Sequence, residues 1–236
     1  MDQTEVREAY GAVAELYISM FGAEEHVHQD DLDLIRRRLG TLTGPVLDLG
    51  CGPGHLSGYL HGHGVDVSGV DLVPEFISHA RAAFPDIVFR VGTLRTVGPP
   101  DHGWSGILAW YSLIHLSPAE IDDELAALRE TITDGGTLVT GCFTADTADT
   151  ADTADTGATG ATGATEATEA TEATEATEAT EATVSAFDHR VLTAYRWQIE
   201  EFVRRVCRAG FVELERIERP ANGPVRAHAA IAARAA

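Results

Sequence analysis

Short apolar runs alternate with helix-like segments through the middle of this chain, and that alternation most strongly restricts the folds open to it. Apolar runs lie at residues 46–50, 65–71, 87–91, 106–110 and 137–143, with helical patterns between most of them. Nearly continuous apolar runs of this length are typical of strands that are buried on both faces. Strands that alternate with helices form a parallel sheet covered on both sides by helices. The pattern therefore predicts an α/β fold.

The two ends of the chain extend this pattern. Residues 5–39 repeat apolar side chains at spacings of three and four, which predicts a helical start. A helix is expected at 198–209, followed by an alternating strand at 211–217 and a last strand at 225–232. The two final strands form a hairpin. We therefore expect a mostly parallel, seven-stranded sheet that ends in an antiparallel hairpin strand.

Residues 144–185 interrupt the pattern with ADT, GAT and then EAT triplets. A period of three fits neither helix nor strand, and alanine is the only apolar side chain, so burial cannot offset the ordering entropy. We predict a disordered, low-complexity insertion, with an interaction tail as the alternative. The sheet pattern resumes afterwards, so residues 1–236 are expected to form one domain. Residues 1–44 would be a helical lid, 45–143 a cofactor-binding core, and 186–236 the helix and hairpin that complete the sheet.

Composition and charge limit the partners. The formal net charge is −20, and the repeat holds ten of the carboxylates, which leaves −10 on the rest. Phosphate backbones need a basic face, so a nucleic-acid partner is not expected. No run approaches the ~18 apolar residues of a membrane span, and the acidic start does not resemble a signal peptide. Three dispersed cysteines and isolated histidine pairs match neither disulfide nor metal-ligand patterns. We expect a cytoplasmic protein without a metal or membrane partner.

A glycine-rich loop follows the first of these strands, in the sequence VLDLGCGPGH that ends at His55. Gly50 and Gly52 have no Cβ, so a ligand can approach the backbone, and the helix that begins after Gly54 offers free N–H groups. A dinucleotide fingerprint needs a third glycine where His55 stands, which disfavours NAD. Asp48, one residue inside the strand end, is placed to influence the loop and a bound amine.

The second strand ends in an acidic residue, Asp71. In open α/β sheets, ligands bind at the carboxyl ends of the strands, and a carboxylate there can accept from both hydroxyls of a cis-diol. Capping of the helix that starts at Pro74 is an alternative role, and both roles can hold together. The residues alone therefore predict a nucleoside-like ligand at the strand ends.

Two motifs carry a resemblance to a known family. VLDLGCGPG at 46–54 and GVDLVPEFI at 69–77 resemble the first two motifs of class I S-adenosylmethionine-dependent methyltransferases. The resemblance implies a Rossmann-like three-layer sandwich, S-adenosylmethionine as cofactor and methyl transfer to O, N or C of a small molecule. It also implies that the glycine loop passes beside the methionine moiety, that Asp71 binds the ribose hydroxyls and that Leu72 packs on the adenine.

Later segments extend the resemblance less specifically. Gly92-Thr93-Leu94 stands where the family usually has Gly-Asp-Leu, which implies that the adenine amino group meets the Thr93 hydroxyl and that the Leu94 N–H is available. The stretch 107–118 is similar to small-molecule methyltransferases and implies backbone contacts to the cofactor's amino group around Ala109 and Trp110. The predicted cofactor-binding residues are thus Asp48, Gly50, Cys51, Gly52, Gly54, Asp71, Leu72, Thr93, Leu94, Ala109 and Trp110.

His115 is the candidate general base, because it follows the fourth strand and histidine titrates near neutrality. A histidine packed structurally beneath the next helix is the alternative. Tyrosines are candidates for a lid or an acceptor pocket, with core packing as the alternative; they are Tyr10, Tyr17, Tyr111 and Tyr195. Two alternative functions remain. Thr93 suggests a non-catalytic S-adenosylmethionine-binding module, and His55 disfavours an NAD-dependent oxidoreductase.

Overall fold

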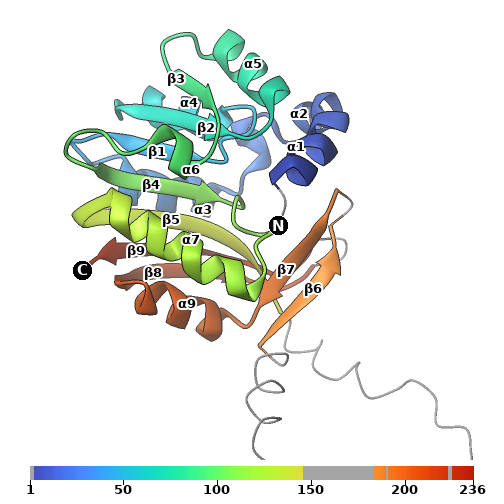
Figure 1. Ribbon diagram of the computed structural model, residues 1–236, viewed down its shortest axis with the longest axis vertical. Coiled ribbons are helices and arrows are strands. Elements are labelled where there is room, and N and C mark those ends of the chain that lie inside the picture. Colours follow the sequence, from blue (N-terminus) through green and yellow to red (C-terminus); the bar gives the residue numbers. More distant parts are fainter. Residues whose placement is uncertain (1–2, 146–182, 190, 223–224) are drawn as a thin grey trace, which may run out of the picture.

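The computed structural model describes residues 3–145, 183–189, 191–222 and 225–236 (Figure 1). The strands are β1 (Val46–Leu49), β2 (Val67–Asp71), β3 (Val88–Val91), β4 (Trp104–Trp110), β5 (Ile132–Thr144), β6 (Val184–Asp188), β7 (Thr193–Trp197), β8 (Phe211–Arg219) and β9 (His228–Ala235). The helices are α1 (Gln3–Ala12), α2 (Ala14–Phe21), the 3₁₀ helix η1 (Glu24–His26), α3 (Gln29–Leu39), α4 (His55–Gly62), α5 (Pro74–Ala83), α6 (Leu94–Val97), α7 (Pro118–Thr131) and α9 (Ile199–Arg208).

Seven strands form the main sheet, in the order β3-β2-β1-β4-β5-β9-β8. The five strands from β3 to β5 pair in parallel. β9 is antiparallel to β5, from Thr137↔Arg234 to Phe143↔His228, and β8 is antiparallel to β9. This arrangement confirms the predicted parallel sheet that ends in an antiparallel hairpin strand.

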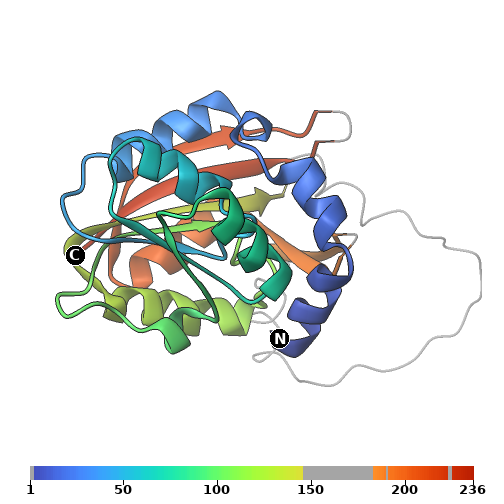
Figure 2. The ribbon, with the colours of Figure 1, turned by 90° about the horizontal axis from the view of Figure 1, so that it is seen from above.

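Helices cover both faces of the sheet and produce three layers (Figures 1 and 2). One buried cluster joins the sheet to α7 and α9, and a second joins it to α3, α4 and α5. Within β1, Leu47 and Leu49 belong to the first cluster, whereas Val46 belongs to the second. Both faces of β1 are therefore buried, which explains why its sequence is apolar at nearly every position.

A second hairpin, β6–β7, was not predicted from the sequence and brings the sheet to nine strands. β7 pairs in parallel with the very end of β5, at Phe143↔Arg196 and Thr144↔Trp197. The backbone N–H of Tyr195 also donates to the carbonyl of Ile114, which follows β4 (2.8 Å). The hairpin is therefore held by long-range pairing beyond the carboxyl ends of β4 and β5.

Three further differences concern element boundaries. The predicted helical start at 5–39 is divided into α1, α2, η1 and α3. The four-residue α6 was not predicted, and β5 begins at Ile132, five residues before the predicted strand. Most of the predicted insertion, residues 146–182, lies outside the described residues, while Val184 and Ser185 at its end belong to β6. Within the described part of the chain, no helix has the length and apolar composition needed to cross a bilayer.

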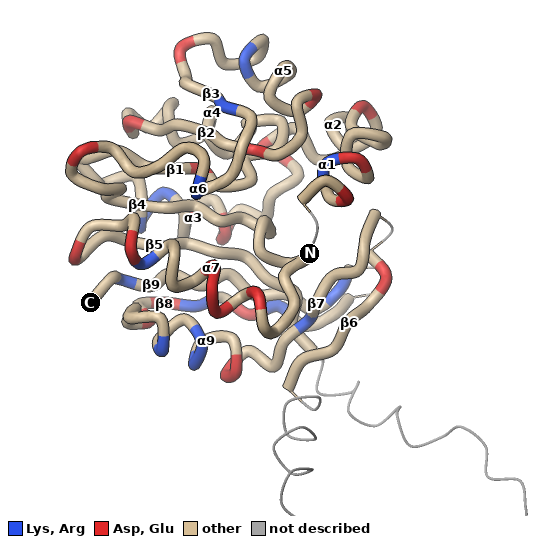
Figure 3. Tube along the Cα trace, in the orientation of Figure 1, with Lys and Arg blue, Asp and Glu red and all other residues tan. Residues whose placement is uncertain are grey.

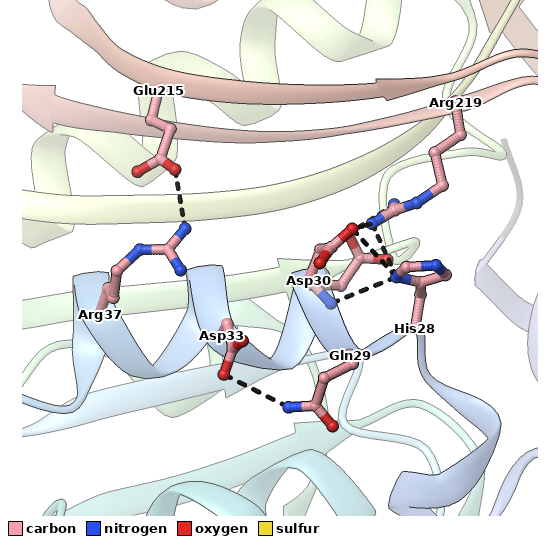
Figure 4. Close-up of polar contacts among 8 residues, drawn as sticks. His28, Gln29, Asp30, Asp33, Arg37, Glu215 and Arg219 are labelled. Carbon is pink, nitrogen blue, oxygen red and sulfur yellow. Dashed lines mark hydrogen bonds and ion pairs between the residues drawn. The ribbon is translucent and has the colours of Figure 1, made fainter.

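Ion pairs and hydrogen bonds hold α3 against the β8–β9 hairpin (Figure 4). Arg37 and Arg38 both bind the carboxylate of Glu215 in β8, at 2.8 and 2.6 Å. Arg219 binds the buried carboxylate of Asp31 at 2.7 Å. Along the described chain, basic positions are interspersed with acidic ones in this way (Figure 3).

Candidate active site

The carboxyl ends of β1 and β2 meet through backbone hydrogen bonds. Because the strands are parallel, their carboxyl ends lie at the same edge of the sheet. The N–H groups of Gly50 and Cys51 both donate to the carbonyl of Val70, at 2.8 and 3.0 Å. The N–H of Gly52 donates to Asp71 Oδ2 at 2.9 Å. The two motifs that the sequence singled out are therefore in direct contact.

Only one of the three loop glycines leaves its backbone against open space. A Cβ added to Gly52, where φ is +52°, would meet nothing within 4 Å. A Cβ on Gly50 would lie 2.4 Å from Ser112 Cβ, and one on Gly54 would lie 2.9 Å from Ala80 Cβ. Gly50 and Gly54 thus allow the loop to pack tightly against its neighbours, and Gly52 is where a ligand can reach the backbone.

Asp71 presents a carboxylate beside this open backbone. Its Oδ1 accepts from the N–H of Val73 at 2.8 Å, and its Oδ2 accepts from Gly52. Val73 is the N-cap residue of α5, so Asp71 binds the turn before the helix and does not itself take the capping position that the sequence offered as an alternative role. A carboxylate offers about four lone-pair sites, so acceptor capacity for a diol remains. Burial raises the pKa of Asp71 to about 6, and the group is therefore ionised at neutral pH and above.

Two predicted site residues lie behind the loop. Asp48 is 1% exposed, and its Oδ2 accepts from the hydroxyl of Ser57 in α4 at 2.6 Å. Cys51 is also buried, and its Sγ lies 2.9 Å from where a Cβ on Gly69 would stand. Burial raises the pKa of the Cys51 thiol well above its usual range. These two side chains hold the loop in place from behind.

Burial of Asp48 predicts a pH-dependent cost in stability. Its pKa rises to about 7, mainly because of desolvation, whereas the unfolded chain releases this proton near 4. The folded state binds more protons between these values, so its contribution to stability falls as pH rises from about 4 to 7. We expect Asp48→Asn to show a smaller loss of melting temperature between pH 5 and pH 8 than the parent. Equal losses in both proteins, measured by thermal unfolding, would contradict this.

The remaining predicted cofactor residues lie at or near the ends of β2, β3 and β4. Thr93 caps α6: its N–H donates to Thr96 Oγ1 at 2.7 Å, and its own hydroxyl accepts from the N–H of Thr96 at 3.4 Å. Leu94 and Ala109 are buried, and the Ala109 carbonyl accepts from the Thr140 hydroxyl at 2.9 Å. Leu72 and Trp110 are partly buried at the ends of β2 and β4.

Ser112 is a site residue that the sequence analysis missed. It lies against Gly50, and its buried hydroxyl has no hydrogen-bond partner among the described residues. Buried hydroxyl groups nearly always have a hydrogen-bond partner. A buried hydroxyl without one at this loop therefore fits a site where a polar ligand supplies the missing hydrogen bond. Nothing in the sequence distinguishes this serine from others.

His115 is 7% exposed and lies between two hydrogen-bond partners from distant parts of the chain. Its Nδ1 is 2.7 Å from the carbonyl of Thr193, and its Nε2 is 2.7 Å from the hydroxyl of Tyr10. A carbonyl only accepts, so Nδ1 carries the hydrogen and Nε2 accepts from Tyr10. Burial lowers the pKa of His115. The side chain is therefore neutral, with a lone pair on Nε2.

The four tyrosines divide between two environments. Tyr10 and Tyr17 pack edge to face, and both contact Phe76 of α5, with ring centroids 6.3 and 5.1 Å away. Burial raises the pKa of both tyrosines, and the negative charge of nearby Asp71 raises it further. Tyr10 and Tyr17 therefore lie near the candidate site. Tyr111 lies directly after β4. Tyr195, in contrast, packs against the core that joins the sheet to α7 and α9.

The fold and this arrangement are those of Rossmann-like proteins, whose ligands bind at the carboxyl ends of the strands. Residues 46–136 match the family model of a methyltransferase domain. An uncharacterised methyltransferase of Mycobacterium tuberculosis is 34% identical over 93 residues, which are 39% of this chain and 37% of that protein. The chain thus spans well under half the length of this relative.

Solved structures show the same fold at low sequence identity. A 1,6-didemethyltoxoflavin N1-methyltransferase of Burkholderia thailandensis, with bound S-adenosylhomocysteine, has a TM-score of 0.69 and 16% identity over 98% of this chain and 88% of its own. The (4+2)-cyclase SpnF has a TM-score of 0.68 and 14% identity over 100% of this chain and 97% of its own. Residues 46–136 therefore resemble a methyltransferase domain, as the motifs at 46–54 and 69–77 suggested, and the solved structures show that the fold is shared.

Proposed function

We propose that this protein transfers a methyl group from S-adenosylmethionine to a small-molecule acceptor. The contact between the Gly52 N–H and the Asp71 carboxylate, beneath open backbone, is the observation that carries the proposal. It combines a bare backbone with an ionised diol acceptor at the strand ends, which a nucleoside cofactor requires. The orphaned hydroxyl of Ser112 supports a ligand at the same loop.

The described residues fit this cofactor. Asp71 would bind the ribose hydroxyls, Leu72 would pack on the adenine, and the Thr93 hydroxyl would accept from the adenine amino group. The backbone from Gly50 to Gly54 would lie beside the methionine moiety, whose amino group would meet the backbone around Ala109 and Trp110. When bound, the cofactor supplies a methyl group that its sulfonium has already activated.

The protein's own task is then to orient the acceptor and to take its proton. Positioning alone can supply ~7–11 kcal/mol of a barrier. The lone pair of His115 Nε2 can accept the acceptor's proton once the acceptor's O–H or N–H takes the place of the Tyr10 hydroxyl. His115 Nε2 would take the proton from the acceptor atom as that atom bonds to the methyl group, and the electron pair of the broken methyl–sulfur bond would remain on the sulfur of S-adenosylhomocysteine. Tyr10 and Tyr17, from α1 and α2, would limit access of water to the site.

A second candidate is a cofactor-binding protein that does not transfer the methyl group. Thr93 favours it, because a neutral hydroxyl that already caps α6 replaces the acidic residue usual in the family. The cyclase with this fold shows that the fold alone does not fix the reaction.

The experiment that separates the two candidates uses S-adenosylmethionine with a deuterated methyl group. The full-length protein is incubated with this cofactor and a metabolite extract, and products are analysed by mass spectrometry. Methyl transfer predicts a metabolite that gains one deuterated methyl group, together with S-adenosylhomocysteine. Binding of the cofactor without any labelled metabolite would favour the non-catalytic candidate. The Asp71→Ala variant, which lacks the carboxylate proposed to bind the ribose, serves as the control.

A further inference from the structure

A row of aromatic rings begins beside Trp110, one of the predicted cofactor residues, and reaches His115. We define the aromatic row as Tyr111, Phe143, Phe187 and His189. Ring centroids are 5.2 Å apart for Tyr111–Phe143 and 5.3 Å apart for both Phe143–Phe187 and Phe143–His189. The His189 ring is in turn 5.7 Å from that of His115. The row therefore connects the candidate base with the β6–β7 hairpin.

These rings come from three elements that meet at one edge of the sheet. Tyr111 follows β4, Phe143 lies at the end of β5, and Phe187 lies in β6. β5 pairs with β7, and β7 pairs with β6, so the hairpin holds Phe187 and His189 beside the strand ends. In Figure 1 the hairpin lies on the same side of the sheet as α1, which carries Tyr10.

All four residues of the aromatic row are partly buried, so none of them is sealed in the core. The backbone of Tyr111 has φ +53°, and among the described residues it is the one non-glycine position with positive φ. Such a strained backbone is unfavourable by itself and concentrates at functional sites. Gly141 accommodates the strained residue, since a Cβ there would lie 3.0 Å from Tyr111 Cε2. The fold thus holds the Tyr111 ring in one position even though the backbone of this residue is strained.

A guanidinium group packs on the outer end of the row, next to Asp188. The guanidinium of Arg226 lies 4.6 Å from the centroid of the Phe187 ring. It also donates to the carbonyl of Asp188 at 3.3 Å. A flat, electron-rich ring packs well against such rings and against a guanidinium plane, whereas a saturated ring of the same size gains only the burial of its surface.

We propose that the aromatic row binds a planar aromatic or heteroaromatic acceptor and presents its ring hydroxyl or ring nitrogen to His115. The proposal rests on the proposed methyl transfer and adds the substrate class to it. The ring of the acceptor stacks on the row, and the substituent to be methylated points toward Nε2. The proton of that substituent passes to Nε2 as its oxygen or nitrogen bonds to the methyl group, the methyl–sulfur bond breaks, and S-adenosylhomocysteine is the leaving group.

The test compares flat ligands with their saturated counterparts. 2-Naphthol and 4-hydroxyquinoline are titrated into the protein with saturating S-adenosylhomocysteine, each beside its fully saturated bicyclic analogue, with calorimetry or saturation-transfer NMR as readout. We expect the flat ligands to bind at least about 10-fold more tightly. An aromatic pair contributes ~0.5–1.5 kcal/mol beyond its area, so Phe187→Leu and Phe143→Leu should each weaken flat-ligand binding about 2- to 10-fold.

Phe84→Leu is the matched control, because Phe84 is also partly buried but lies after α5, near Gly58 and outside the row. Its flat-ligand affinity should equal that of the parent. Equal affinity for flat and saturated ligands, no binding of either, or the same loss in Phe84→Leu as in both row variants would overturn the proposal. S-adenosylhomocysteine affinity, measured separately for every protein, reports folding and the proposed function independently. If the parent does not bind S-adenosylhomocysteine, the proposed function is refuted. The preference for flat ligands can still be measured in that case, by repeating the ligand titrations without S-adenosylhomocysteine.

Discussion

Asp71→Ala should weaken S-adenosylhomocysteine binding at least about 100-fold. The substitution would remove the carboxylate that accepts two hydrogen bonds from the ribose hydroxyls in the proposed complex, each worth ~1.5–3 kcal/mol when a charged group takes part. It also removes the acceptor of the Gly52 N–H, so the glycine loop loses its tie to the end of β2. Isothermal titration calorimetry measures the change directly.

The control for this variant is Asp66→Ala. Asp66 is exposed just before β2 begins, so the substitution removes a carboxylate at the opposite end of the same strand. It should bind S-adenosylhomocysteine like the parent. The parent's affinity should also fall as pH drops below about 6, because the raised pKa of Asp71 makes the carboxylate a protonated, weaker acceptor there. If Asp71→Ala binds as tightly as Asp66→Ala, Asp71 does not bind the ribose.

His115→Asn should lower the turnover number about 10²- to 10⁴-fold, the usual contribution of a positioned general base. Asparagine is a suitable replacement because its side-chain amide can still donate to the Thr193 carbonyl, as Nδ1 does now. The hairpin contact is thereby kept, and the basic Nε2 is lost. The reaction is followed with the acceptor identified by deuterated methyl transfer, and S-adenosylhomocysteine affinity should stay within about threefold of the parent.

The pH profile distinguishes a base from a structural histidine. Burial lowers the pKa of His115, so Nε2 remains unprotonated below the usual histidine range near 6.5. With S-adenosylmethionine kept saturating at every pH, so that protonation of Asp71 does not limit the rate, we expect the parent's kcat to hold below pH 6.5 and then to fall at lower pH. We expect that fall to be absent in His115→Asn. Full turnover in His115→Asn would assign the histidine to a structural role between Tyr10 and Thr193.

The main sheet was predictable because its signals are local. The apolar run at Val46–Leu49 is buried on both faces, and the alternation of β8 follows from its one exposed face. The β6–β7 hairpin has no such signal, because its stability comes from pairing with Phe143 and Thr144, some fifty residues earlier. Likewise, the breaks between α1, α2 and α3 leave the helical spacing of apolar residues nearly intact.

The candidate site was predictable where a motif fixes the backbone. Gly52 and Asp71 were identified from their positions at strand ends, and they are hydrogen-bonded. The partnership of Tyr10 with His115 joins residues 105 positions apart, and no local pattern records it. Ser112 and Phe187 were missed for the same reason, since their importance comes from neighbours that only the folded chain supplies.

The most direct test of the central claim is calorimetry of S-adenosylhomocysteine with the full-length parent, beside an identical titration with NAD. If the open backbone at Gly52 and the Asp71 carboxylate form a cofactor site, S-adenosylhomocysteine should bind saturably at one site per chain and raise the melting temperature, while NAD should do neither. Absence of heat and of thermal stabilisation at saturating S-adenosylhomocysteine would contradict the account.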